Sequence, residues 1–182
     1  CNLGTEDPSD DIPLSFPDSS FVHTLNIVGK QWVILPVDLA ASDDIDFYVD
    51  WGDGNCTHHI KSDVDDDDNG NDLVTYQYQR DDGVQRELQL RIIGVVDNWG
   101  SDDNNDDYAE LLKSVENLGD VEWTDLSYAF RDGISLESFM APHTDTSNVT
   151  TLKSMFWNSN NESFTTIDLS SFNTENVTDM SS

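Results

Sequence analysis

The sequence predicts a mainly β protein, in which a small β-sandwich is followed by a short helix and a stacked array of repeats. Two observations carry this prediction. The first hundred residues hold five short segments rich in β-branched and aromatic residues, separated by acidic or glycine-containing turns. The last third of the chain, from Trp123 to Ser182, repeats itself at intervals of 26 to 28 residues.

The repeat is carried by apolar positions. The motif Asn148-Val149-Thr150 recurs as Asn176-Val177-Thr178. A more diverged copy of the unit covers Trp123 to Phe130. Such a period predicts stacked units, each of which buries its apolar edge on its neighbours. The corresponding positions are Trp123, Val149 and Val177; Leu126, Leu152 and Met180; Phe130 and Phe156; Leu136 and Phe164; Phe139 and Ile167; Ala141 and Leu169.

The five strand-like segments precede the repeats. They cover residues 21–28, 32–37, 45–51, 73–78 and 87–95. The third ends in the turn Trp51-Gly52-Asp53-Gly54, whose glycines permit a positive φ. We interpret Asp53 as a carboxylate that accepts backbone N–H bonds within the turn, because no second acid or base lies at an interpretable spacing.

A short helix is expected between the strands and the repeats, over Tyr108 to Asn117. Leu111, Leu112 and Val115 lie three and four residues apart, Asp106 or Asp107 can cap the start, and Gly119 follows the expected end. We expect this helix to cover the first repeat. The predicted organisation is therefore an acidic tether over 1–20, a sandwich over 21–96, an acidic junction with a capping helix over 97–119, and repeats over 120–182.

The charge of the chain is extreme. It has 37 acidic and 8 basic residues, for a formal net charge of −29. Nucleic acids and anionic membranes bind through Lys and Arg, so this balance argues against both. No run of about 18 apolar residues is present, so no membrane-spanning helix is predicted. We interpret the acidic residues as keeping the protein soluble in a salty exterior. The alternative is that local Asp clusters bind cations.

The first residue, Cys1, predicts a lipid anchor. A chain that begins at Cys and continues as a polar, acidic, Pro-containing tract resembles a mature bacterial lipoprotein, which would place the protein on a cell surface with lipid on Cys1. The alternatives are a Cys1–Cys56 disulfide or a chain start that falls at a cysteine by coincidence. Membrane contact is expected only through such an anchor.

Two families resemble parts of this sequence. The Trp51-Gly52-Asp53-Gly54 turn, with Tyr76-Gln77-Tyr78 and the apolar run Leu88 to Val95, resembles PKD-type β-sandwich domains, although the usual His-x-Tyr is missing. The motifs Asn-Val-Thr-x-Leu-x-Ser-Met-Phe and Leu-Ser-Ser-Phe-Asn-Thr-Glu resemble BspA-like leucine-rich-repeat surface lipoproteins over about Asp120 to Ser182. This second resemblance implies a leucine-rich-repeat-type solenoid on a bacterial cell surface, with a role in adhesion.

An Asp-rich segment is a calcium candidate. Asp65, Asp67, Asn69 and Gly70 match the first half of the loop D-x-D-x-N-G, but position twelve is Tyr76 rather than a bidentate Glu. A solvated acidic loop is the alternative. The full set of candidate Ca²⁺ ligands is Asp63, Asp65, Asp67, Asn69 and Asp72. A second candidate set is Asp102, Asp103, Asp106 and Asp107.

Other polar residues are interpreted as structural. Neighbouring strand residues point to opposite faces, so His58 and His59 cannot easily share a metal ion, and we assign them to a surface loop. The recurring Asn148/Asn176 and Thr150/Thr178 are expected to hydrogen-bond the backbone of successive units, which also explains two of the Asn-x-Ser/Thr triplets without glycans. No spacing predicts an enzyme.

The function predicted from sequence is binding. Trp157 follows the periodic Phe156 and is expected to be exposed, and exposed aromatic residues often contact partners. The candidate partner residues are Trp157, Asn158, Asn160 and Met180. The partner would be an extracellular protein or glycan, bound by an adhesion protein; the alternative is a structural subunit, whose open repeat end after Met180 stacks on copies of itself.

Overall fold

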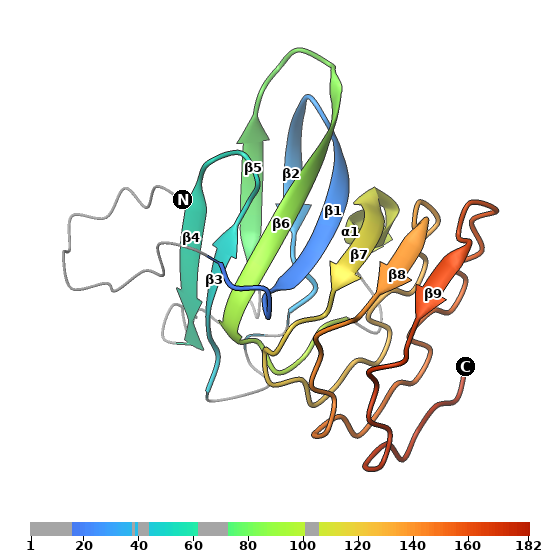
Figure 1. Ribbon diagram of the computed structural model, residues 1–182. Coiled ribbons are helices and arrows are strands. Elements are labelled where there is room, and N and C mark those ends of the chain that lie inside the picture. The colour runs from blue at the N-terminus through green and yellow to red at the C-terminus, as the bar shows by residue number, and fades with distance from the viewer. Residues whose placement is uncertain (1–15, 38, 40–43, 62–72, 101–105) are drawn as a thin grey trace, which may run out of the picture.

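The computed structural model describes residues 16–37, 39, 44–61, 73–100 and 106–182, which form two β-sheets and one short helix (Figure 1). The protein is mainly β, as the sequence predicts. The elements are β1 (Phe21–Val28), β2 (Lys30–Ile34), β3 (Asp46–Asp50), β4 (Cys56–Ile60), β5 (Thr75–Gln79), β6 (Gln85–Val95), α1 (Asp106–Leu111), β7 (Leu112–Asn117), β8 (Ser138–Met140) and β9 (Thr166–Asp168).

The larger sheet is open and changes from antiparallel to parallel partway across. Its strand order is β4-β3-β6-β1-β7-β8-β9, while β2 and β5 pair with each other in a second sheet. β1 runs antiparallel to both β6 and β7, and β8 and β9 then continue parallel to β7. One sheet therefore extends from the antiparallel strands into the repeats, with β4 and β9 at its edges (Figure 1).

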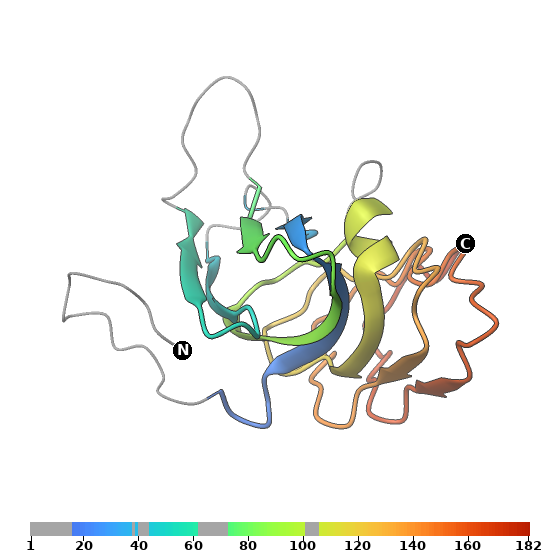
Figure 2. The same cartoon turned by 90° about the horizontal axis from the view of Figure 1, so that it is seen from above.

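The antiparallel part is a two-layer arrangement. The β2–β5 pair lies over one face of the larger sheet (Figure 2). Alternate residues of β1 are buried, as expected for a strand with one face toward a core. The five predicted strands correspond to β1, β2, β3, β5 and β6, with shifted ends. The fully or nearly fully buried side chains here include Phe21, Leu25, Ile27, Val33, Phe47, Val49, Tyr78, Leu90 and Ile92.

The turn before β4 is fixed by its carboxylate. Asp53 accepts hydrogen bonds from the backbone N–H of Asn55 at 3.1 Å and from the Tyr76 hydroxyl at 2.8 Å. Gly52 has a φ of 76°, and a Cβ there would lie 2.5 Å from the Gln89 carbonyl oxygen. Burial, followed by the bond to Asp53, raises the pKa of Tyr76 to about 12. The structural interpretation of Asp53 is confirmed.

The helix prediction is wrong for its second half. Helix α1 ends at Leu111, and the rest of the expected helix is strand β7, which pairs with β1. Two register shifts interrupt this pairing, and Leu112 and Val115 are both buried although they lie three positions apart. An irregular strand can thus imitate helical spacing. Pairing with β1 makes this segment a strand rather than a helix.

Among the described residues after Val96, successive turns of the chain stack on one another. Parallel bridges join Asn98 to Asp125, Asp125 to Thr151 and Thr151 to Asp179. On the sheet side, Phe139 of β8 pairs with Ile167 of β9, as the repeat alignment predicts. The stack begins before the recognisable repeats, because Asn98 and β7 occupy the turn preceding Asp125 and β8.

Asn117 joins the antiparallel strands to this stack. Its Nδ2 donates to the carbonyl oxygens of Asp18 and Ser20, each at 3.0 Å, and its Oδ1 accepts from the His143 backbone N–H at 3.0 Å. Next to it, Gly119 has a φ of 70°, and a Cβ there would lie 2.4 Å from the Phe21 nitrogen. The chain before β1 therefore lies tightly against the end of β7.

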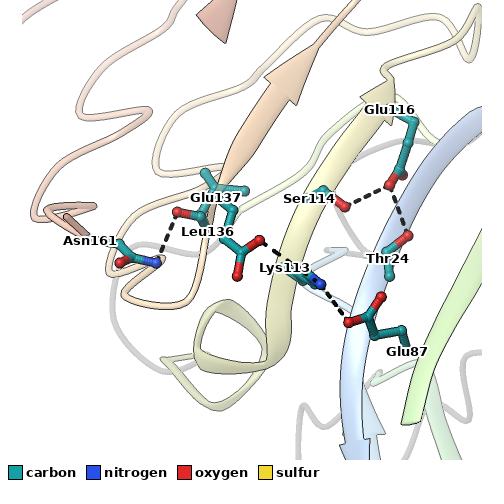
Figure 3. Close-up of polar contacts among 8 residues, drawn as sticks. All are labelled: Thr24, Glu87, Lys113, Ser114, Glu116, Leu136, Glu137 and Asn161. Carbon is teal, nitrogen blue, oxygen red and sulfur yellow. Dashed lines mark hydrogen bonds and ion pairs between the residues drawn. The ribbon is translucent and has the colours of Figure 1, made fainter. Parts of the chain in front are cut away.

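On the polar face of the sheet, ion pairs cross the boundary between the two parts. Lys113 of β7 lies between Glu87 of β6 and Glu137, and contacts both (Figure 3). Its bond to Glu87 raises the pKa of Lys113. Glu116 accepts hydrogen bonds from the hydroxyls of Thr24 at 2.8 Å and Ser114 at 2.6 Å. These residues pair among themselves, and the arrangement is that of a seam between strands.

In the part of the chain that the structure describes, no helix is long and apolar enough to span a membrane.

Candidate functional site

An exposed corner of the stacked turns carries the best candidate site. Trp157 is 46% exposed, as its position outside the apolar period predicts. The guanidinium of Arg131, from the preceding turn, lies over its indole ring at 4.7 Å from the ring centroid. The backbone N–H of Asp132 donates to the Trp157 carbonyl oxygen at 2.9 Å, so the two turns are held in register at this point.

The Arg131–Trp157 contact is supported by a small polar network. The Asp132 carboxylate accepts one bond from Arg131 Nε at 3.0 Å and another from Asn158 Nδ2 at 2.6 Å. Asp132 and Asn158 are equivalent in successive turns, and both have left-handed backbones, with φ of 57° and 58°. Asp and Asn tolerate this conformation better than most residues. The repeat therefore places Asp132 and Asn158 side by side, in the same backbone conformation, and so positions the network.

Tyr128 extends this surface toward a second cation. Arg131 lies 5.6 Å from the Tyr128 ring centroid, and Lys153 Nζ lies 5.4 Å from the same centroid. Both separations are within the range of cation–π attraction. Two of the chain's 8 basic residues thus meet aromatic rings here, in a protein of net charge −29. We call this surface the Trp157 corner: Tyr128, Arg131, Asp132, Lys153, Trp157 and Asn158.

The structure does not bring all the sequence candidates together. Asn158 belongs to the Trp157 corner, and Asn160 is exposed two residues further on. Met180 instead falls in the row of Leu126 and Leu152, and is 59% exposed because none of the described residues stacks beyond it. Arg131, Asp132 and Tyr128 were missed by sequence analysis, although the 26-residue offset between Arg131 and Trp157 was a usable signal.

The principal calcium candidates cannot be placed. Asp63, Asp65, Asp67, Asn69 and Asp72 lie outside the described residues, as do Asp102 and Asp103. Of the second set, Asp106 and Asp107 begin helix α1. Within the ranges that are described, no group of three or more His, Cys, Asp and Glu side chains could hold a metal ion. Calcium binding stays a prediction.

Cys56 is buried at the beginning of β4, with 6% exposure, and Cys1 lies outside the described residues. Lipidation of Cys1 and a Cys1–Cys56 disulfide are mutually exclusive uses of one sulfur. The structure describes Cys56 as disulfide-bonded, and none of the described cysteines is free, which favours the disulfide alternative. Lipidation of Cys1 stays a prediction.

The assignment of His58 and His59 to a loop is wrong, because both lie in strand β4. Strand β4 could not be recognised from the sequence, because its residues have mixed polarity. His58 stacks on Tyr48 at 4.1 Å and bonds Asp46, whereas His59 packs beside Phe47 and bonds the Thr57 hydroxyl at 2.7 Å. The two rings face opposite sides of the strand, as expected for neighbouring strand residues.

Many acidic residues act within turns. Asp145, Asp168 and Asp179 each accept the backbone N–H two residues later, at 2.8 to 2.9 Å. The residue two positions later is a serine in each case, and its hydrogen bonds lower the pKa of the carboxyl. These serines are Ser147, Ser170 and Ser181. Side chains of this kind replace backbone partners in turns. Part of the high Asp content therefore serves the repeat structure, a role that the charge count does not reveal.

Threonine hydroxyls form a ladder along the stack. Thr150 donates through N–H and Oγ1 to the Thr124 carbonyl oxygen, at 3.0 and 3.3 Å. Thr178 repeats both bonds to Thr150, at 2.8 and 3.2 Å. Asn176 likewise donates to the Ser147 carbonyl oxygen at 2.7 Å. The expectation that these recurring polar residues hydrogen-bond successive turns is confirmed for Thr150, Thr178 and Asn176.

An aromatic cluster lies where β1, α1 and the first turn meet. The His23 ring contacts Trp99 and Tyr108, with centroids 5.7 and 5.9 Å away, and is completely buried. Among the described residues, no hydrogen-bond partner reaches either His23 ring nitrogen, the Trp99 indole nitrogen or the Tyr108 hydroxyl. Burial lowers the pKa of His23 to about 3, so the ring is neutral at physiological pH.

Comparison with known proteins adds a partial match. The family described as "Mycoplasma protein of unknown function, DUF285" matches residues 105–182, which is less than half of the 182-residue chain. No curated protein and no solved structure matches the chain. The matched part contains α1, β7, β8, β9 and the Trp157 corner, and is therefore similar to a family whose function is itself unknown.

Proposed function

We propose that this protein is an extracellular binding protein whose repeats present the Trp157 corner to a partner. In this proposal the antiparallel part is a PKD-like β-sandwich, and the stacked turns are a leucine-rich-repeat-type solenoid of the BspA-like kind. The parallel bridges at intervals of 26 to 28 residues support the second assignment. The two-layer arrangement and the Trp51-to-Gly54 turn support the first.

The observation that carries the proposal is the exposed Trp157 held by Arg131. Aromatic and Arg side chains dominate the binding energy of many interfaces. A ring already fixed by a neighbouring turn loses less conformational freedom when a partner binds. The neighbouring Tyr128 and Lys153 widen the surface.

A binding assay tests this function. Purified matrix proteins and glycans would be immobilised and exposed to the wild-type chain, a Trp157→Ala variant and a Trp32→Ala variant. Trp32 is the matched control, because it is an exposed tryptophan on β2, far from the stack in sequence. We expect saturable binding that the Trp157 substitution weakens about tenfold, or about 1.4 kcal/mol, and that the Trp32 substitution leaves unchanged. Equal effects of the two variants would reject the Trp157 corner.

Anchoring and calcium complete the proposal and have separate tests. Intact mass of membrane-extracted protein would distinguish lipid on Cys1 from a disulfide to Cys56. A calcium site of millimolar affinity should stabilise the chain by about 1 kcal/mol at several millimolar Ca²⁺. An unchanged melting temperature under those conditions would remove the Asp63–Asp72 candidate.

The alternative function is assembly with copies of the same chain. It is favoured by the exposed apolar side chains of Ile167, Leu169 and Met180, with 52%, 43% and 59% exposure. Sedimentation at high concentration tests it. A monomer up to about millimolar concentration would reject assembly through this face.

A further inference from the structure

We propose that the Trp157 corner is a saccharide site that favours neutral sugars over acidic ones. This inference rests on the proposed function and names the class of its ligand. Three features of the Trp157 corner carry it: a fixed aromatic face, a pair of oriented polar groups, and the sign of the charge between them.

The indole ring offers a flat apolar surface. Arg131 covers one face of the ring at 4.7 Å, while 46% of the residue remains exposed. The C–H-rich face of a pyranose packs on such a ring, because both surfaces are flat and weakly hydrated. The contact with the guanidinium holds the ring in place before any ligand arrives.

The polar groups beside the ring suit vicinal hydroxyls. Asp132 accepts bonds from Arg131 and Asn158, which fix its carboxylate in position. A carboxylate can accept about four hydrogen bonds, and an amide offers two donors and one acceptor oxygen. Asp132 and Asn158 therefore keep bonding capacity beyond the bonds that orient them. Planar acceptors and donors side by side match the paired O–H groups of a sugar ring.

The pairing of both cations in the Trp157 corner with carboxylates, together with the negative charge of the whole chain, argues against acidic sugars. Asp132 lies at the centre of the polar network, and its negative charge already pairs with Arg131. Lys153 lies close enough to Asp179 to help lower that carboxyl's pKa, so its charge is also partly balanced. The whole chain carries −29. A uronic acid or a sulfated sugar would thus meet a carboxylate inside a strongly negative field.

Exposure alone does not distinguish Trp157 from Trp32. Trp32 is 61% exposed, more than Trp157, yet no aromatic ring or cation of the described residues packs on it. Its paired neighbour on β5 is Gln77. The ring is neither fixed on one face nor flanked by an oriented Asp–Asn pair. We expect no saccharide binding there.

Tryptophan fluorescence and saturation-transfer NMR on the full chain test the inference. The probes are neutral oligosaccharides of glucose, galactose, mannose and N-acetylglucosamine, with hyaluronan and heparin as acidic probes. We expect at least one neutral probe to bind saturably, and Trp157→Ala to weaken it about tenfold. Trp32→Ala should leave its affinity within about twofold. Asp132→Asn, which keeps the shape but removes the charge, should reduce the preference for neutral over acidic probes. Thermal melting of each variant confirms that it folds.

The possible results separate this inference from the proposed function. Tighter binding of hyaluronan or heparin than of every neutral probe would overturn the inference. Trp157-dependent binding to purified matrix proteins alone would also overturn it, while the proposed binding function would stand. Failure of all saccharides and proteins to bind would overturn both.

Discussion

The antiparallel strands and the stacked turns share one sheet but bury their residues differently. In the antiparallel part, Phe21, Phe47 and Leu90 are all completely buried. In the stack, burial decreases from each turn to the next toward the C-terminus. Phe139 is completely buried, whereas its equivalent Ile167 is 52% exposed. The first region has a uniform core, and the second has a graded one.

The difference follows from how contacts are distributed along the chain. β1 pairs with β6 and β7, so each residue of the antiparallel core depends on segments far away in sequence. A turn of the stack touches only the turns before and after it, as in other repeat arrays. A destabilising change should therefore affect the whole antiparallel core when it falls in the first region, and only the neighbouring turns when it falls in the second. Four predictions test this contrast, from the largest expected effect to the smallest.

The largest effect should come from acid acting on His23. Its folded-state pKa is about 3, against the ordinary histidine pKa of 6.5. Between these values the unfolded chain binds a proton that the folded chain does not, so stability is complete above pH 6.5 and falls as the pH drops toward 3. The loss should reach about 4 kcal/mol at pH 3. The aromatic rings that contact His23 are those of Phe21, Trp99 and Tyr108, none of which carries a negative charge that could balance an imidazolium.

Denaturant unfolding from pH 7 to pH 3 measures this loss. Because the carboxylates also titrate in that range, the informative quantity is the difference between the wild type and His23→Phe, which has no proton to bind. His143→Ala removes an exposed histidine and serves as the control. If the wild type and His23→Phe show parallel pH profiles, His23 does not cause acid sensitivity.

The second prediction tests the gradient itself. Leu126 is completely buried, Leu152 is half-buried and Met180 is 59% exposed, although the three positions are equivalent. Substitution by Ala should cost about 3 kcal/mol at Leu126, about 1.5 kcal/mol at Leu152 and under about 0.5 kcal/mol at Met180. Urea titration of the three variants gives these values. Equal losses at all three positions would mean that burial in the stack is not graded.

The third prediction concerns the connection between the regions. Asn117→Ala removes three hydrogen bonds, to Asp18, Ser20 and His143, and leaves their backbone groups without this partner. We expect a loss of about 2 kcal/mol, and earlier hydrogen exchange in β7 than in β3. Asn148→Ala, at an exposed position, is the control. A loss no larger than the control's would show that the two regions are held together without Asn117.

The smallest effect is expected from the threonine ladder. Thr150→Val keeps the shape of the side chain but removes the hydroxyl that donates to Thr124. The expected loss is about 0.5 to 1 kcal/mol, because the bond is exposed and the backbone bond remains. Thr165→Val, whose hydroxyl bonds no side chain or carbonyl of the described residues, should change stability less. Calorimetry of both variants measures the difference.

Sequence periodicity predicted the fold where the period was regular. The alignment of Phe139 with Ile167 and of five strand segments with β1, β2, β3, β5 and β6 could be read from alternation and repetition. It failed at β7, where register shifts produce helix-like spacing, and at β4, where alternation of polarity is weak. In both cases pairing with a distant strand overrides the local pattern.

The candidate site was only partly accessible to sequence analysis. Exposure of Trp157 followed from its place outside the apolar period. Its contact with Arg131 depends on two turns lying in register, so it needs the stack to be built first. The same holds for the Asp132–Asn158 pair, since each residue alone has the composition of an ordinary turn. The neutral, buried state of His23 could not be foreseen, because a lone histidine in a strand gives no indication of its surroundings.

The position of β7 favours folding of the stack in one direction, from β7 toward β9. One edge of β7 pairs antiparallel with β1, and its other edge receives β8 in parallel. β7 is thus a template: each later turn can fold onto a surface that is already in place, without waiting for residues that follow it. Folding can then proceed in the order in which the chain emerges during synthesis. Turns could be added or lost through evolution at the far side of the stack while β1 to β7 keep the same structure.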